Sequence, residues 1–286
     1  MSILRSEHPI FLIHQSYRQR KLLPSCLSLI SSTFGDRLKT GVIIRRPQLS
    51  QESALVFAKQ CLKSTDLIIA DPEVYAHQNS YGCISNTGKK NCDYFNKEIP
   101  KNVDIIWIKH ILKAQREAGA TVMLSPASYL EPSLTGLNDL KLQLAWAAAT
   151  KPQLAQGEEL LVNLTLNHKW LSDDTSRAKL LNEILDTNFE NFYIRVLWPS
   201  MSPRYGQLRS QQILAGYREL STTLSSENRS LLLPTTSLTG WLNVAWGAAG
   251  FSLGPSFDQQ AFAIPIKIAR QPGTVSPPIK DRYFER

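Results

Sequence analysis

Residues 67–72 read LIIADP, in which four apolar residues lead directly into Asp71 and Pro72. A short, continuous apolar run bounded by turn residues is typical of a strand that is buried on both faces, as in a parallel sheet. A polar stretch with little helical character follows, from about residue 74 to 101. The sequence therefore predicts a core strand that ends on a carboxylate and continues into a long loop.

Seven other runs have the same apolar character, at 10–16, 41–46, 121–126, 160–166, 192–199, 230–236 and 250–255. Segments with apolar residues at three- and four-residue spacing, the period of an amphipathic helix, follow the strands. They lie at roughly 24–34, 51–63, 103–118, 137–149, 175–186, 207–224, 237–248 and 257–263. Eight strands that are each followed by a helix predict a (β/α)8 barrel of the TIM type rather than a doubly wound sheet.

The chain of 286 residues is 43% hydrophobic and 20% charged, which is ordinary for a globular protein. No linker divides it, so we expect one domain over residues 1–286, with an inserted loop at about 74–101 and a Pro-rich tail at about 271–286. No apolar run is long enough to span a membrane or to form a signal sequence. These features predict a cytoplasmic protein without a membrane segment.

Lys and Arg outnumber Asp and Glu by 32 to 24, which gives a net charge of +8. Such a balance attracts polyanions, although an ordinary basic enzyme can carry the same charge. Seven cations follow strands or lie in the loops near them, and we expect them to gather at one end of the barrel and to contact nucleic acid. They are Arg18, Arg45, Arg46, Lys89, Lys90, Lys169 and Arg204.

In a barrel of this kind the active site forms at the carboxyl ends of the strands. Asp71 and Glu73 are the predicted catalytic carboxylates, because the side-chain period of two places both on the same face as Ile69. An alternative for Asp71 is a structural role as the cap of an Asx-turn. Predicted substrate-binding residues at other strand ends are Gln15, Tyr17, Ser125, Asn163, Asn167, Arg195 and Trp198.

Metal and cofactor motifs are not found in the sequence. No C-x-x-C pair of the kind that binds zinc occurs, and no histidine lies in a G-x-S-x-G nucleophile-elbow motif. The phosphate-binding loop G-x-x-x-x-G-K is also absent. We therefore predict no cofactor and no metal. Cys83 and Cys92 share the inserted loop, and a disulfide between them or a metal site with His77 is a weaker alternative.

Aromatic residues recur in the loops at the predicted active end, interleaved with the cations. An aromatic platform with a cationic rim suits a flipped or single-stranded base, and it suits a sugar equally well. The residues are Tyr17, Tyr75, Tyr81, Tyr94, Tyr129, Trp170, Trp198 and Tyr205. Trp241 and Trp246 lie instead in a helical pattern and are expected to pack against the barrel.

Two segments carry a resemblance to a known group of proteins: LIIADPEVY at 67–75 and LLLPTTS at 231–237. The chain resembles the tRNA-guanine transglycosylase-like superfamily, and within it the bacterial anti-phage DNA glycosylases that excise glucosylated hydroxymethylcytosine. Transglycosylases of this type carry a nucleophilic aspartate just ahead of the later motif, where this chain has Ser230 and Leu231. Their Cys/His zinc site is missing as well.

The resemblance, with this departure, implies a hydrolase that leaves an abasic site rather than a base-exchange enzyme. It implies Asp71 as the principal carboxylate and double-stranded phage DNA with a flipped modified base as the partner. A small-molecule barrel hydrolase or lyase, acting on an anionic or sugar-containing substrate, is the competing interpretation, and a binding barrel without catalysis is a third. Nothing in the sequence points to an obligate protein partner.

Overall fold

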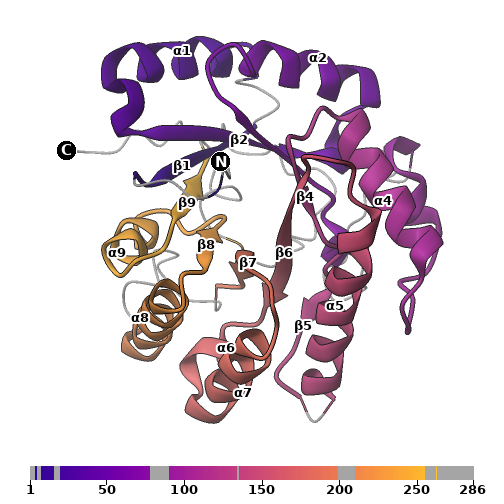
Figure 1. Cartoon of the computed structure of the whole chain (residues 1–286), viewed down its shortest axis with the longest axis vertical. Coiled ribbons are helices and arrows are strands. Elements are labelled where there is room, and N and C mark those ends of the chain that lie inside the picture. Colours follow the sequence, from indigo (N-terminus) through magenta and orange to yellow (C-terminus); the bar gives the residue numbers. More distant parts are fainter. Residues whose placement is uncertain are drawn as a thin grey trace, which may run out of the picture.

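In the computed structural model, the strands form a closed barrel and the helices surround it (Figure 1). The structure describes residues 4, 8–15, 20–77, 90–133, 135–198, 210–254 and 262. The strands are β1 (Ile10–His14), β2 (Lys39–Arg45), β3 (Leu67–Asp71), β4 (Val122–Leu124), β5 (Tyr129–Leu130), β6 (Glu159–Leu166), β7 (Asn191–Val196), β8 (Ser230–Leu233) and β9 (Gly250–Leu253).

All strand pairs among the described residues are parallel, and β1 pairs with both β2 and β9, so the sheet closes on itself. The predicted TIM-type barrel is therefore confirmed. The helices are α1 (Leu23–Phe34), α2 (Gln51–Cys61), α4 (Ile105–Glu117), α5 (Gly136–Thr150), α6 (Lys169–Ser172), α7 (Asp174–Leu185), α8 (Gln211–Ser226) and α9 (Thr239–Ala245). Short 3-10 turns lie at Gly35–Arg37, Arg46–Gln48, Val74–His77, Asp93–Asn96 and Lys151–Gln153.

One strand position differs from the prediction, because β4 and β5 share it. Both pair with β6, β4 near its start and β5 near its end. Ser125 lies in the interruption between them: its N donates to Leu161 O at 3.1 Å, and its Oγ accepts from Asn163 N at 3.0 Å. The hydroxyl thus replaces the backbone carbonyl that a continuous strand would supply, and the barrel keeps eight strand positions.

The barrel interior is filled by apolar side chains at alternate positions of the strands. Leu12, Ile69, Leu161 and Leu232 belong to one buried cluster and come from β1, β3, β6 and β8. These are alternate strands in the order of the barrel, which is how four side chains form one layer in this fold. The side chains two residues further along the same strands therefore lie on top of a closed apolar layer.

Side-chain caps mark the start of some of the helices. Ser50 Oγ accepts from Ser53 N at 3.3 Å at the start of α2, and the side chain of Asp173 accepts from Ser176 N at 2.8 Å at the start of α7. Both are residue types that favour the N-cap position, because a short oxygen-bearing side chain satisfies a free amide there. The helix predicted at 257–263 lies outside the described residues, apart from residue 262.

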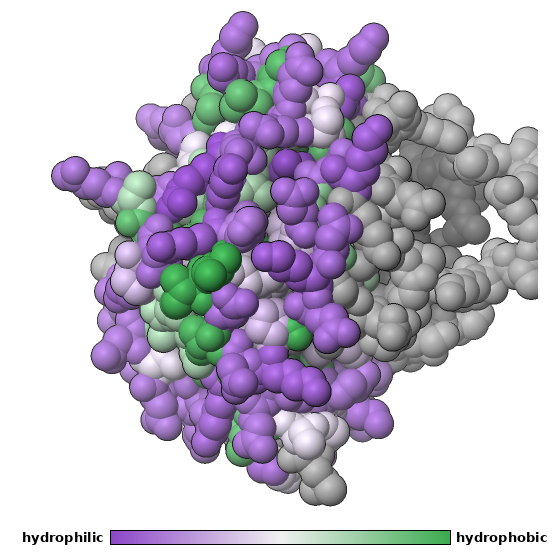
Figure 2. Space-filling view, turned by 90° about the vertical axis from the view of Figure 1, so that its right-hand side faces the viewer, coloured by the Kyte–Doolittle hydropathy of each residue, from purple (hydrophilic) through white to green (hydrophobic). Residues whose placement is uncertain are grey.

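The outer surface of the helical layer is mostly polar. Figure 2, which views the side on which α4 lies, shows a largely hydrophilic face with small apolar patches. Trp241 on α9 was predicted to be core but is 52% exposed, because only part of its ring is covered, by Phe251 at 4.9 Å and Phe11 at 6.3 Å between ring centroids. None of the described helices is long and apolar enough to cross a membrane.

Candidate functional site

A second layer, which is polar except for one proline, lies directly above the apolar one at the carboxyl ends of the strands. Each of its members follows a member of the apolar layer by two residues along the chain. These members are His14 in β1, Asp71 in β3, Asn163 in β6 and Pro234, which comes directly after β8. The side-chain period of two turns all four toward the barrel axis. They are buried, with His14 4% exposed and Asp71 and Asn163 each 1% exposed. The barrel thus has an apolar floor with polar groups above it.

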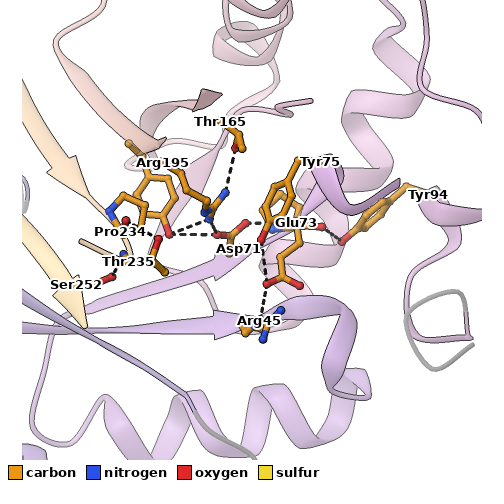
Figure 3. Close-up of polar contacts among 12 residues, drawn as sticks. Arg45, Asp71, Glu73, Tyr75, Tyr94, Thr165, Arg195, Pro234, Thr235 and Ser252 are labelled. Carbon is orange, nitrogen blue, oxygen red and sulfur yellow. Dashed lines mark hydrogen bonds and ion pairs between the residues drawn. The ribbon is translucent and has the colours of Figure 1, made fainter. Parts of the chain in front are cut away.

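Asp71 is held from both of its oxygens (Figure 3). Oδ1 accepts from Glu73 N at 2.9 Å, and Oδ2 accepts from Tyr193 Oη at 3.1 Å and from Nη2 of Arg195. Nη1 of Arg195 donates in turn to Thr165 Oγ1 at 3.1 Å. The hydrogen bond to Oδ1 forms the Asx-turn that was the alternative role for Asp71. Oδ2 makes in addition a buried ion pair with Arg195, which an Asx-turn does not require.

Arg195 is enclosed by aromatic rings as well as by its carboxylate. Its guanidinium carbon lies 4.5 Å from the centroid of Tyr75 and 5.5 Å from those of Tyr193 and Phe262. Burial lowers the pKa of Arg195, but Asp71, Tyr75, Tyr193 and Glu73 together outweigh it and the net shift is upward. Burial raises the pKa of Tyr75 and of Tyr193, so both phenols keep their protons at neutral pH and act as hydrogen-bond donors.

Glu73 lies beside Asp71 and is paired with Arg45 from the neighbouring strand. Arg45 Nε donates to Glu73 Oε1 at 2.5 Å, and Tyr75 Oη donates to the same oxygen at 3.4 Å. Glu73 has a φ of 48°, an unusual backbone conformation for a residue with a side chain. Tyr94 Oη fixes the preceding residue by donating to Pro72 O at 2.9 Å. Both predicted carboxylates are thus brought together, each with its own arginine.

His14 and Asn163 are buried, and their side chains have no hydrogen-bond partner among the described residues. Neither ring nitrogen of His14, and neither the Oδ1 nor the Nδ2 of Asn163, bonds to any residue that the structure describes. Burial lowers the pKa of His14 well below its usual value, and the charges of Arg195 and Arg45 lower it further. The ring is therefore neutral at neutral pH.

Sequence reasoning included Asn163 among the candidate residues but missed His14, because in the first strand it chose Gln15 and Tyr17 rather than the alternate set of positions to which His14 belongs. The alternation Ile10, Leu12, His14 is the signal that finds it.

Other predicted substrate-binding residues bond to the frame of the barrel or follow the ends of the strands. Ser125 bridges the β4–β5 interruption. Asn167 Nδ2 donates to Tyr129 Oη at 2.8 Å and to Glu131 Oε2 at 2.7 Å, while its Oδ1 accepts from Lys169 N at 2.8 Å. Gln15 is buried at the end of β1, and Trp198 is half-buried after β7. Tyr17 lies outside the described residues.

The predicted cationic rim is only partly at the surface. Arg46 is 2% exposed, and it donates from Nε to Ala114 O at 3.0 Å and from Nη1 to Leu49 O at 2.8 Å, so its guanidinium ties the loop after β2 to α4. Arg45 pairs with Glu73. Lys90 and Lys169 are exposed as expected. Arg18, Lys89 and Arg204 lie outside the described residues.

The aromatic residues do not form the expected exposed platform where the structure describes them. Tyr75, Tyr94, Tyr129 and Trp170 are at most 8% exposed. Trp170 Nε1 donates to Leu130 O at 3.1 Å, which makes it part of the frame. Loops near the mouth fold back onto the barrel, so an aromatic residue in a loop becomes core.

No group of three or more His, Cys, Asp or Glu side chains within the described ranges is arranged to hold a metal ion. Cys92 is buried with a free thiol. Scans of protein-family models and of curated protein sequences found no match to the chain.

Proposed function

We propose that the protein is a DNA glycosylase that hydrolyses the N-glycosidic bond of a modified base and leaves an abasic site. The observation that carries the proposal is the place of Asp71, a fixed carboxylate in the interior layer at the C-terminal mouth of a TIM-type barrel. Active sites of such barrels form at this end. The resemblance of 67–75 and 231–237 to barrel enzymes of base cleavage and the net charge of +8 support the same proposal.

The chemistry assigned to the site is a displacement at C1′ of the deoxyribose. The C1′–N bond breaks and its electron pair stays on the base, while a water oxygen forms a bond to C1′ and the departing base takes up the proton that the water loses. Positive charge develops on the sugar in the transition state. A carboxylate that is already oriented stabilises this charge without reorganising during the reaction.

Asp71 has the capacity for this role despite its ion pair. Arg195 and Tyr193 occupy Oδ2, whereas the one hydrogen bond that Oδ1 accepts from a described residue comes from Glu73 N. A carboxylate oxygen accepts two hydrogen bonds. The remaining acceptor position of Oδ1 is therefore assigned to the attacking water, and Arg195 and Tyr193 are positioning residues that fix the carboxylate.

The test is single-turnover release of base from plain and glucosylated phage DNA, followed as abasic sites. Asp71→Asn is expected to lower the rate by about 10²- to 10³-fold, the scale for removing one preorganised electrostatic group. Asp173→Asn makes the same chemical change at the exposed N-cap of α7 and should leave the rate unchanged. Equal rates for wild type and Asp71→Asn, with the variant shown to be folded, would remove Asp71 from the mechanism.

A second candidate function is favoured by the enclosure of the site. Asp71, Asn163 and Arg195 are at most 2% exposed, and a closed interior suits a small substrate better than a polymer. A barrel hydrolase or lyase acting on a sugar-containing small molecule fits this observation. The two functions differ in salt dependence, because several phosphate contacts give a steep decline of affinity with salt and a single small ligand does not.

A further inference from the structure

His14 and Asn163 face one another across the barrel. They lie on β1 and β6, and three strand positions separate these strands on either side of the ring: β2, β3 and the shared β4–β5 position on one side, and β9, β8 and β7 on the other. Both follow a member of the same apolar layer, Leu12 and Leu161, by two residues. Side chains from alternate strands at equivalent positions meet in one layer. The two polar side chains therefore belong to the same layer above the apolar one.

These side chains offer a definite set of donors and acceptors. Neutral imidazole has one N–H and one accepting nitrogen, and the amide of Asn163 has two N–H groups and an accepting oxygen. All are buried, and none bonds to a described residue. Buried polar groups in native proteins are almost always satisfied, so a cluster of unsatisfied ones requires an explanation. A ligand that completes their hydrogen bonds is the explanation that the geometry supports.

The charges around this layer define the ligand further. Arg195 and Arg45, the two cations whose charges lower the pKa of His14, are each paired with a carboxylate, Asp71 and Glu73. Within the part of the chain that the structure describes, both cations near His14 are therefore already neutralised and do not favour an anion. Pro234, the fourth member of the layer, adds a buried apolar surface. The ligand is expected to be neutral, with both donors and acceptors on its edge.

We propose that His14 and Asn163 together recognise the hydrogen-bonding edge of a neutral nucleobase that enters the barrel from its C-terminal mouth. The identity of the ligand as a base rests on the proposed function, whereas a neutral donor-acceptor ligand follows from the site alone. A flipped base read in this way presents its edge to the two side chains, in the same layer as the Asp71 carboxylate. The sugar attached to a modified base shares the same chemistry, and the experiment separates the two.

The experiment is calorimetric titration of the full chain with deoxycytidine, 5-hydroxymethyl-deoxycytidine and free glucose. His14→Phe and Asn163→Leu are each expected to weaken nucleoside binding by about tenfold, the effect of losing one to two hydrogen bonds. His14→Gln, which keeps a donor and an acceptor, should retain more affinity than His14→Phe. The matched controls are His110→Phe and Asn182→Leu, which make the same changes at exposed positions on α4 and α7.

A thermal melt without ligand separates a binding role from a structural role, because the two roles predict opposite changes in Tm. If the groups are unsatisfied in the free protein, His14→Phe and Asn163→Leu should keep or raise the Tm, by about 2–4 °C per group. A lower Tm in both variants with unchanged nucleoside affinity would overturn the proposal. So would the lack of nucleoside binding to the wild type, or binding of glucose alone.

The outcome is separable from that of the proposed function. Nucleoside binding that depends on His14 and Asn163, in a protein that releases no base, supports the recognition site and rejects the glycosylase. Base release with a KM that neither substitution changes rejects the recognition site and leaves the glycosylase standing.

Discussion

Arg195 and Asp71 form a buried ion pair that crosses the interior of the barrel from β7 to β3, with both side chains at most 2% exposed (Figure 3). The pair joins residues that are 124 positions apart in the sequence. Two charges taken out of water this completely need close geometry and further hydrogen bonds to offset the loss of hydration. Tyr193, Thr165 and the amide of Glu73 provide them.

Removing one member of this pair should destabilise the fold far more than removing both. Arg195→Met leaves the Asp71 carboxylate buried without its cation and is expected to lower the free energy of unfolding by about 3–5 kcal/mol. Arg195→Met with Asp71→Asn should recover part of that loss. Urea unfolding of the two single variants and the double variant measures the coupling, and additive losses would show that the pair contributes no coupling energy.

Stability should fall as the pH drops below about 6.5, because of His14. Burial lowers the pKa of His14, and Arg195 and Arg45 add to the shift, so the native state stays neutral while the unfolded state binds a proton. Such a group reduces stability by up to about 1.4 kcal/mol per pH unit until its native pKa is reached. Urea unfolding at a series of pH values below 6.5 should show that the free energy of unfolding falls less steeply with pH in His14→Phe than in the wild type.

The same pH series needs one control, because burial also lowers the pKa of His168. His168→Phe should remove a smaller part of the slope, since this side chain is less deeply buried than His14. A slope unaffected by His14→Phe would mean that the imidazole is protonated in the native protein.

If DNA binds at the mouth, Lys90 and Lys169 should contribute to its salt dependence. Each exposed lysine that contacts a phosphate adds about one unit to the slope of log affinity against log salt, so Lys90→Gln and Lys169→Gln should each flatten it by about that amount. Lys179→Gln on α7 removes the same charge elsewhere and serves as the control.

Arg46 should behave differently from these lysines. Its guanidinium bonds to the carbonyls of Ala114 and Leu49, so Arg46→Ala is expected to lower the free energy of unfolding by leaving buried carbonyls unsatisfied. A flattened salt slope with unchanged stability for Arg46→Ala would contradict this assignment.

The loop after β8 contains backbone strain that a glycine should relieve. Thr235 has a φ of 55°, a conformation that β-branched residues rarely adopt. Thr235→Gly is expected to raise the free energy of unfolding by up to about 1 kcal/mol, since the strain exceeds the entropy that glycine adds to the unfolded chain. Thr236→Gly, at a position of negative φ, should lower the free energy of unfolding. The difference between the thermal melts of the two variants measures the strain at Thr235.

The strand and helix pattern was determined by the sequence itself. Apolar runs and three- and four-residue spacings are local, and they predicted the eight strand positions, the longer helices among the described residues and the place of Asp71 at the end of β3. The N-caps Ser50 and Asp173 are equally local, because each side chain bonds to an amide three residues ahead. Strands, helices and N-caps depend on residues that are close in sequence, so the sequence is enough to predict them.

Only the tertiary structure decided which polar groups meet. Closure of the barrel brings Arg195 to Asp71 and places His14 opposite Asn163, and no periodicity within one strand encodes partners on another. Packing against α4 buries Arg46 and Tyr94, whose residue types predict exposure at a rim. Burial is a property of the whole packed molecule, so the charge, pairing and accessibility of the site follow from the assembled barrel rather than from any segment of the sequence.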